Sequence, residues 1–219
     1  MFSWKYTGVF LAVCAIFISG CRGTIPSFVA PDFDKRCIRL IALMPIDNKT
    51  KDQKAAVILR KELLEELYFK GYPQIPLDVI DGKIKEINER NLVTTGKRIP
   101  PDVIGEALGI DAVMYCTLTE WGVSLRYLYA PTTVAASFEL LSAKTGETLW
   151  RSNQKVVERD YDITQKRLEM KSHESYEIAV REVLDKAIAT FPDGPDCLGD
   201  PSSSTGVKDI LIRLKKSVQ

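Results

Sequence analysis

Apolar positions near the start of the chain follow two different periods. Residues 37–46 are almost continuously apolar, as in a strand that is covered on both faces. Residues 52–70 instead place apolar side chains every three or four positions, which predicts an amphipathic helix that Asp52 caps. We expect the buried stripe of this helix to consist of Ala56, Leu59, Leu63 and Leu67, with Val57, Leu64 and Tyr68 beside it.

Shorter elements follow in the middle of the chain. Residues 77–80 predict a short second strand, and residues 81–90 predict a helix that begins at an Asp. Residues 94–100 are polar and predict a loop. A short helix is expected over residues 101–108, because it starts with Pro and is followed by Gly109, which ends helices well.

Alternating apolar and polar residues mark three longer strands. The alternating runs cover residues 112–119, 132–142 and 148–158, and a turn-forming segment at residues 144–147 separates the last two. Consecutive strands with such short connections favour an antiparallel meander. A final helix is expected over residues 172–191, where the helical period returns.

The order of these elements predicts an α/β domain over residues 37–191. Its first half should be a βαβ unit with parallel strands, and its second half should add an antiparallel three-strand meander. The expected product is one mixed sheet packed by helices.

The first 20 residues predict a signal peptide. They carry one charged residue, Lys5, and an apolar run over residues 8–18 that is shorter than the roughly 17–25 residues needed to cross a bilayer. The end of this segment resembles the bacterial lipobox, which signal peptidase II cleaves before the cysteine. The residues that carry this resemblance are Ile18, Ser19, Gly20 and Cys21.

By that resemblance Cys21 is the lipidation site. Its thiol would receive a diacylglycerol and its new α-amine a further acyl chain such as palmitate, and two or three chains hold a protein on a membrane. Arg22 stands where an Asp would favour retention in the inner membrane, which points to the outer membrane, facing the periplasm. A plain secretory signal with a chance cysteine and an uncleaved short helix are the alternatives.

Three further segments flank the domain. Residues 21–36 lack periodicity and predict a tether, and residues 192–206 are rich in Pro, Gly and Ser and predict a flexible linker. Residues 207–219 carry four basic residues and one Asp on an amphipathic pattern. This basic helix could bind an anionic membrane, a partner or its own domain. Its candidate contact residues are Ile210, Leu211 and Leu214.

Composition narrows the chemistry. The 219 residues are 45% hydrophobic and 27% charged, and 30 basic residues against 29 acidic ones give no charge excess that would favour nucleic acid. The single histidine, His173, excludes a metal site built on several His ligands within this chain. No phosphate-binding, nucleophile-elbow or metalloprotease motif is present, so we predict no cofactor, no metal and no catalytic residue.

Three cysteines follow the lipobox: Cys37, Cys116 and Cys197. No CxxC motif is present. An oxidising periplasm would permit one disulfide and leave one thiol over. Cys37 and Cys116 fall in apolar strand patterns, which favours burial as small hydrophobic side chains instead.

Two positions have both a structural and a functional interpretation. Asp47 follows the first strand, where open α/β sheets bind ligands, but capping of the turn at residues 47–50 is the simpler explanation. Trp121 precedes Gly122 at an expected bulge and is explained by packing. The tip of the hairpin that follows is unusually apolar and is a candidate partner contact. The residues of this tip are Leu125, Tyr127, Leu128 and Tyr129.

Short motifs in a fixed order resemble a family of periplasmic and outer-membrane lipoproteins typified by a meningococcal surface-antigen lipoprotein. The motifs are Leu43-Met44-Pro45, Asp47-Asn48-Lys49-Thr50, Gly71-Tyr72, the segment from Glu106 to Val113, Thr119-Glu120-Trp121-Gly122 and the segment from Thr145 to Trp150. The family resembles the amino-terminal domain of TolB and, more distantly, the curli-secretion lipoprotein. The resemblance implies an outer-membrane lipoprotein in a transport or assembly system, with other envelope proteins or a second copy of itself as partners. It supplies no catalytic residues.

We therefore predict a non-enzymatic, lipid-anchored envelope lipoprotein that acts by binding partners. The alternatives are a periplasmic hydrolase or thiol enzyme, with a cleft near Asp47 or an exposed Cys197, and a subunit of a secretion pore.

Overall fold

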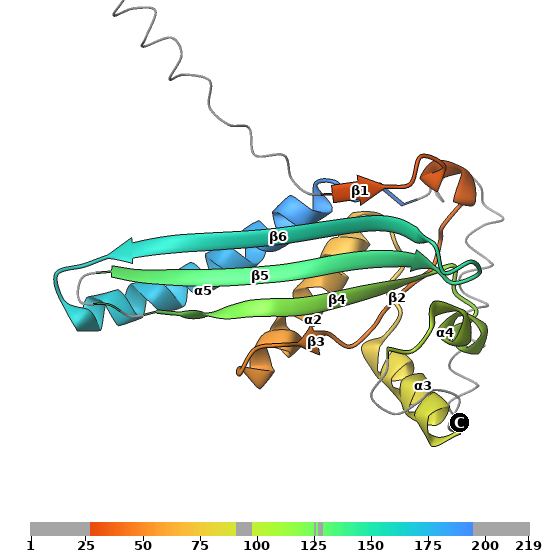
Figure 1. Ribbon diagram of the computed structural model, residues 1–219, viewed down its shortest axis with the longest axis horizontal. Helices are drawn as coiled ribbons and strands as arrows, with labels where there is room; N and C mark the ends of the chain where they lie inside the picture. Colours follow the sequence, from red (N-terminus) through yellow and green to blue (C-terminus); the bar gives the residue numbers. More distant parts are fainter. Residues whose placement is uncertain (1–26, 91–97, 125, 127–128, 195–219) are drawn as a thin grey trace, which may run out of the picture.

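The computed structural model describes residues 27–90, 98–124, 126 and 129–194. Within these residues one sheet with six strands is covered by helices (Figure 1). The strands are β1 (Ser27–Val29), β2 (Ile41–Leu43), β3 (Asp47–Asn48), β4 (Ala112–Val123), β5 (Tyr129–Ser142) and β6 (Thr148–Tyr161). The helices are the 3₁₀-helix η1 (Phe33–Arg36) and the α-helices α2 (Gln53–Phe69), α3 (Leu77–Glu89), α4 (Pro101–Leu108) and α5 (Gln165–Ile188).

The sheet is mixed, as the element order predicts. Its strand order is β1-β6-β5-β4-β2, and β3 pairs with β4 beside β2. β2 and β3 run parallel to β4, while β4, β5 and β6 form the antiparallel meander. The predicted α/β fold class, a βαβ unit followed by a meander, is therefore confirmed.

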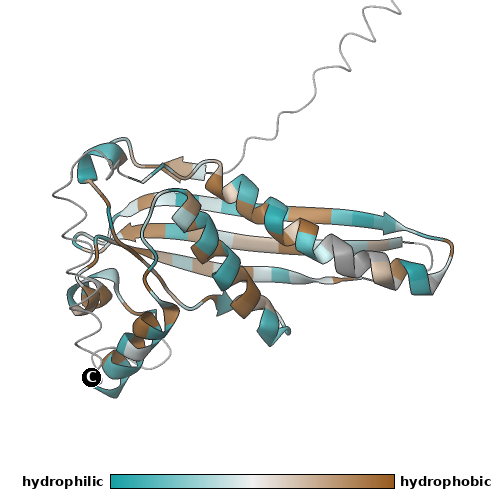
Figure 2. Ribbon diagram, turned by 180° about the vertical axis from the view of Figure 1, so that it is seen from behind, coloured by the Kyte–Doolittle hydropathy of each residue, from teal (hydrophilic) through white to brown (hydrophobic). Residues whose placement is uncertain are grey.

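Alternation along β4 divides the apolar residues between two cores. Met114 and Cys116 face α2 and α5, while Val113 and Tyr115 face α3 and α4. The larger core lies along the length of the sheet under α2 and α5 (Figure 2). The smaller core lies only at the end of the sheet that carries β2, so α3 and α4 leave most of that face without a helix (Figure 1).

Polar side chains occupy the face that α3 and α4 leave open. The Nζ atom of Lys155 on β6 lies 2.6 Å from a carboxylate oxygen of Glu120 on β4. Glu139 on β5 pairs with Arg98 and Arg151, at 2.9 Å and 2.5 Å. Cross-strand ion pairs of this kind are compatible with solvent, so this face needs no helix to cover it.

The predicted second strand at residues 77–80 is wrong, because these residues form the first turn of α3. The carbonyl oxygen of Pro76 accepts hydrogen bonds from the N–H groups of Val79 and Ile80, at 3.1 Å and 3.3 Å. Ile80 and Ile87 are both buried, so the helical spacing continues through the segment that was assigned to a strand. In the described part of the chain, the connection from β3 to β4 therefore contains the helices α2, α3 and α4.

The buried stripe of α2 differs from the prediction at its edges. Ala55 rather than Ala56 is buried with Leu59, Leu63 and Leu67, which are spaced four residues apart. Val57 and Tyr68 are exposed rather than packed beside the stripe. Leu64 is partly buried against the larger core, as predicted.

The segment predicted as a tether is structured from Ser27 onward. β1 pairs antiparallel with Trp150–Ser152 of β6, and the N–H of Ala30 donates to the carbonyl of Leu149 at 2.8 Å. Phe33 is buried in the larger core. Pairing with a sheet edge needs no hydrophobic periodicity in a segment this short, which is why the pattern did not reveal it.

Cys37 does not belong to a strand. It is exposed and ends η1 in the left-handed region, with φ at 46°. The predicted burial of Cys37 is therefore wrong, whereas Cys116 is buried as predicted. The last helix, α5, begins at Gln165, earlier than the pattern indicated.

Leu63→Ala should lower the free energy of unfolding by about 2–5 kcal/mol, because Leu63 is fully buried beneath α2 and the change leaves a cavity. Val57 lies on the same helix and is 70% exposed. Val57→Ala should therefore change stability by less than about 0.5 kcal/mol. Urea denaturation followed by circular dichroism measures both, and equal effects would contradict the assigned helix face.

Candidate functional site

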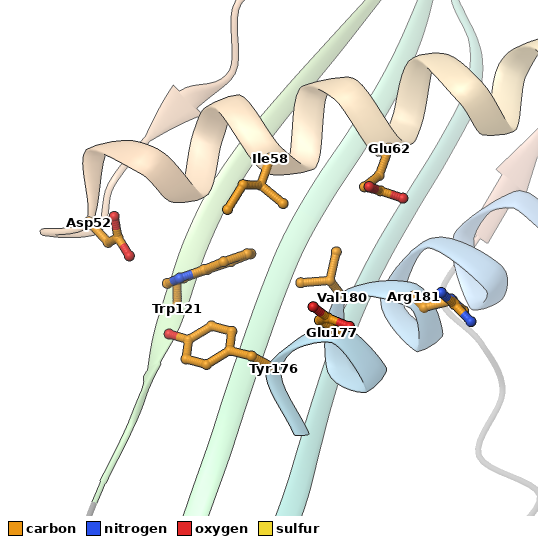
Figure 3. Close-up of a pocket in the computed structure, with 8 residues that line it drawn as sticks. All are labelled: Asp52, Ile58, Glu62, Trp121, Tyr176, Glu177, Val180 and Arg181. Atoms are coloured by element: carbon orange, nitrogen blue, oxygen red, sulfur yellow. The ribbon is translucent and has the colours of Figure 1, made fainter. Parts of the chain in front are cut away.

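A groove of about 530 Å³ lies between α2 and α5 on the helix-covered face of the sheet (Figure 3). Trp121 of β4 forms its floor, α2 supplies one wall and α5 supplies the other. The lining residues are Asp52, Ile58, Glu62, Trp121, Tyr176, Glu177, Val180 and Arg181.

A bulge in β4 places Trp121 in this groove. The pairing of β4 with β5 shifts between Leu118 and Glu120, so that Leu118 pairs with Ala136 and Trp121 pairs with Val134. Without the shift, Trp121 would face the opposite side from Leu118, because side chains alternate along a strand. A bulge is thus present close to the expected place, at Thr119 rather than at Gly122, which pairs with Thr133, and it moves an indole ring to the helix side.

Apolar groups in the groove remain partly open to solvent. The Trp121 and Tyr176 rings lie with their centroids 4.9 Å apart at an angle of 44°. Ile58 and Val180 point into the same space from the two helices (Figure 3), and Ile58 is 47% exposed. Exposed aromatic and aliphatic side chains that meet in a groove are typical of a protein-binding site.

Acidic residues surround this apolar floor. Three acidic residues line the groove: Asp52 at the start of α2, Glu62 further along the same helix and Glu177 on α5. They outnumber the single cation among the lining residues, Arg181. The Asp52 carboxylate accepts a hydrogen bond from the N–H of Lys54 at 2.9 Å, which fixes its position at the end of the groove. Burial, and secondarily the negative charge of Asp52, raises the pKa of Tyr176 to about 12.

The negative charge continues beyond the groove along the seam between the helices. Burial raises the pKa of Glu66 on α2, and the charges of Asp185 on α5 and of Glu62 raise it further. A ligand that enters the groove therefore meets an apolar floor within an acidic surrounding, which favours apolar side chains accompanied by Lys or Arg.

Among the described residues that line the groove, no nucleophile is paired with a base. None of the eight lining residues named above is His, Cys or Ser, and the two aromatic side chains are packed against each other. Among the described residues, no group of three or more His, Cys, Asp or Glu side chains is arranged to hold a metal ion. An apolar floor within an acidic surrounding is an arrangement suited to binding.

The structure places only part of the predicted hairpin tip. Tyr129 begins β5, is half-buried and lies against Tyr161, with ring centroids 5.1 Å apart. Backbone hydrogen bonds of 2.8 Å and 3.2 Å join Arg126 and Tyr129 across the turn. The remaining candidate contacts and the lipobox lie outside the described residues. These are Leu125, Tyr127, Leu128, Ile210, Leu211, Leu214, Ile18, Ser19, Gly20 and Cys21.

Asp47 lies apart from the groove. Its carboxylate is 2.9 Å from the Lys49 ammonium and its side chain is 56% exposed. Asn48, not Asp47, caps the turn, because its side-chain oxygen accepts hydrogen bonds from the N–H and hydroxyl of Thr50 at 2.9 Å and 2.7 Å. Burial raises the pKa of the Cys116 thiol, which makes Cys116 a poor nucleophile. Cys197 lies outside the described residues.

A helix that spans a membrane must be both long and predominantly apolar. No helix within the described part of the chain is both long enough and apolar enough to span a bilayer.

Comparison with known proteins identifies the family. Residues 32–191 match the family described as "Putative lipoprotein GNA1162-like". The chain belongs to this GNA1162-like family. The resemblance inferred from the short motifs is therefore confirmed, and the match covers all the elements from η1 to α5.

The GNA1162-like family includes relatives in Neisseria. The chain is 28% identical over 134 residues to NMB1124/NMB1162 of Neisseria meningitidis serogroup B. This alignment covers 59% of the chain, and the chain spans only 62% of the length of that relative.

Two solved structures are also similar to this chain. The crystal structure of lipoprotein GNA1162 from Neisseria meningitidis is 26% identical, with a TM-score of 0.48, and the match covers 64% of this chain and 98% of that one. A PelC dodecamer from Paraburkholderia phytofirmans is 13% identical, with a TM-score of 0.44, and the match covers 75% and 98% of the two chains.

Two residues of the groove have a predicted role in the sequence, Asp52 as a helix cap and Trp121 in packing. Trp121 stands out beside Gly122, whereas the half-exposed Ile58 is indistinguishable from the core residues of its helix. The groove depends on α2 and α5, which are far apart in the chain, so no local pattern could reveal it.

Tyr176→Phe should remove the tyrosine that ionises at about pH 12. The folded pKa is above the ordinary value of 10.0, so this group's contribution to stability is complete below pH 10 and is lost as the pH rises through about 12. Rapid pH-jump absorbance at 295 nm should show one late-ionising tyrosine fewer in the variant. Tyr68→Phe, on the exposed side of α2, is the matched control, and this variant should retain the late-ionising tyrosine.

Proposed function

We propose that this GNA1162-like protein is a lipid-anchored, non-enzymatic lipoprotein of the outer membrane that faces the periplasm and binds other envelope proteins. The lipobox formed by Ile18, Ser19, Gly20 and Cys21 is the single observation that carries the proposal. Family membership supports the lipoprotein assignment. Transport or assembly of envelope components is the role that this anchored binding protein would serve.

Cys21→Ala should abolish incorporation of radiolabelled palmitate and move the protein out of the membrane fraction, because it removes the thiol that takes the diacylglycerol. Cys14→Ala lies in the same leader and removes a thiol that the lipobox does not use, so this control should remain labelled. Density-gradient separation of the two membranes then tests the outer-membrane location. Palmitate on the Cys21→Ala variant would contradict the anchor.

The groove between α2 and α5 is the proposed partner site. Its apolar floor of Trp121 and Tyr176 and its acidic residues favour a segment that combines apolar and basic side chains. We assign the groove to such a segment of another envelope protein. The hairpin tip around Tyr129 and the segment with Ile210, Leu211 and Leu214 are further proposed contacts, on the basis of their sequence patterns alone.

A photoreactive amino acid in place of Ile58, in the full chain in living cells, tests this assignment. Peptide sequencing should find it crosslinked to another envelope protein, at a segment where apolar residues alternate with Lys or Arg. Glu62→Lys should lower the yield severalfold, because it reverses one charge beside the groove.

The matched control carries the photoreactive residue in place of Asn153, which is exposed on β6. It should not crosslink to the same segment. A crosslink from position 58 to residues 207–219 of the same chain would assign the groove to this chain's own basic segment and contradict binding of a partner there.

A further inference from the structure

A long stretch of the outer edge of the sheet has no neighbouring strand among the described residues. β1 pairs only with residues 150–152 of β6, whereas β6 continues to Tyr161 and pairs with β5 up to that residue. Residues 153–159 of β6, which we call the free edge, therefore have a described strand on one side only (Figure 1). At about 3.4 Å per residue the free edge is roughly 24 Å long.

The backbone of the free edge is already extended and fixed in place. It pairs with β5 from Asn153 opposite Ser137 to Arg159 opposite Pro131. Val156 is 4% exposed and lies in the larger core, which anchors the helix-side face of this stretch. A fixed edge strand presents outward N–H and C=O groups at alternate residues, in the geometry that an added strand needs.

Side chains on the open face give the free edge a positive charge. Lys155 and Arg159 lie four residues apart, so both face the same side of the sheet, and Val157 lies between them. The Lys155 side chain is 53% exposed, and Arg159 is also exposed.

The contacts of these two cations leave room for a further carboxylate. Lys155 lies opposite Ala135 of β5, which in turn lies opposite Glu120 of β4. The Lys155 ammonium thus reaches across a small side chain to the Glu120 carboxylate, and an exposed ion pair of this kind is weak. Arg159 lies opposite Pro131, which has no carboxylate to offer.

We propose that the free edge binds an extended segment of another protein by strand addition, and that this segment carries two acidic residues four positions apart with a β-branched residue midway between them. In an antiparallel pairing the acidic residues would lie opposite Lys155 and Arg159, and the β-branched residue would lie opposite Val157. Opposite charges and apolar side chains directly across a pair of strands stabilise their pairing. Backbone hydrogen bonds would supply affinity, and the charged positions would supply specificity.

The charge pattern disfavours a second copy of β6 as the occupant. Two antiparallel copies centred on Val157 would place Lys155 of each copy opposite Arg159 of the other. Like charges directly opposite each other destabilise a pair of strands. The same two cations therefore repel a second copy in this register and attract an acidic strand.

The chain's own terminal segments are also poorly suited in sequence. Residues 21–26 contain no acidic residue and end in a proline, which has no N–H group to donate. Asp196 and Asp200 have the required spacing, but a proline flanks them on each side and Gly199 lies between them. Proline and glycine both weaken a strand, so this segment is too short and too irregular to fill the edge.

The free edge and the groove favour opposite charges in what they bind. The groove is lined by acidic residues of α2 and α5, whereas the free edge carries cations of β6. A segment that fits one surface does not fit the other. Failure of the groove assignment would therefore leave the proposal for the free edge standing, and the two can be tested apart.

Amide hydrogen exchange of the full chain in detergent, followed by nuclear magnetic resonance, tests the strand addition. The probe is the peptide Thr-Glu-Thr-Val-Thr-Glu-Thr. At saturating peptide, alternate amides within residues 153–159 should exchange about tenfold more slowly or less, because they gain hydrogen bonds to the added strand. A control peptide of the same composition with its two Glu residues adjacent should bind severalfold more weakly. Absence of amide protection, or equal binding of the two peptides, would overturn the proposal.

Charge reversal tests the role of the two cations. Lys155→Glu combined with Arg159→Glu should weaken peptide binding by about tenfold or more, measured by fluorescence anisotropy. Lys155→Arg should retain binding. Lys85→Glu changes an exposed cation on α3 and is the matched control, which should bind as the unaltered chain does. Circular dichroism checks that each variant folds, and unchanged binding by the folded double variant would contradict the assigned specificity.

A photoreactive amino acid in place of Asn153, in the full chain in living cells, identifies the occupant. It should crosslink to another protein at a segment with the acidic spacing described above, and the double charge reversal should lower the yield severalfold. Glu62→Lys should leave this yield unchanged, because Glu62 lines the groove instead. A crosslink to a second copy or to residues 195–219 of the same chain would overturn the proposal, as would the absence of any crosslink.

Discussion

Phe191 holds together the parts of the chain that are farthest apart in sequence. Its ring contacts Trp150 of β6, Tyr72 after α2 and Phe33 of η1, with centroid distances of 4.8, 5.4 and 6.4 Å. Edge-to-face rings of this kind combine large buried area with a defined geometry. Because Phe191 lies three residues after the end of α5, this cluster fixes where that helix ends on the sheet. It thereby also fixes the second wall of the groove and the direction in which residues 192–194 leave.

Local patterns were enough to predict the parts of the fold that local physics determines. The three alternating runs became β4, β5 and β6, and Gly109 ends α4 with φ at 67°, as a helix-terminating glycine should. The prediction for residues 77–80 was wrong because a segment with only three apolar residues fits both the strand and the helix period. Ile84 and Ile87 decide in favour of the helix only once the second core is known. β1 was missed because its stabilisation comes from the edge of β6, more than a hundred residues away.

The candidate site was less predictable than the fold. The lipobox is a continuous motif and can be read directly, whereas the groove needs a bulge in β4, a half-exposed residue of α2 and one wall of α5 at the same place. The sequence indicates packing for Trp121, but it does not distinguish its packing partner Tyr176 from the other residues of the last helix. Side chains that define a shared surface acquire that role only from the tertiary arrangement, and neither Ile58 nor Glu62 carries any local sign of it.

The position of β1 determines how far this domain could stand from a membrane. Six peptide steps join Cys21 to Ser27, which at about 3.6 Å each places the start of β1 within roughly 20 Å of the lipid if Cys21 carries the acyl chains. From Ser152, the partner of Ser27, β6 continues to Tyr161, a further length of about 30 Å. If Cys21 carries the acyl chains, the far end of β6 would therefore lie within about 50 Å of the lipid.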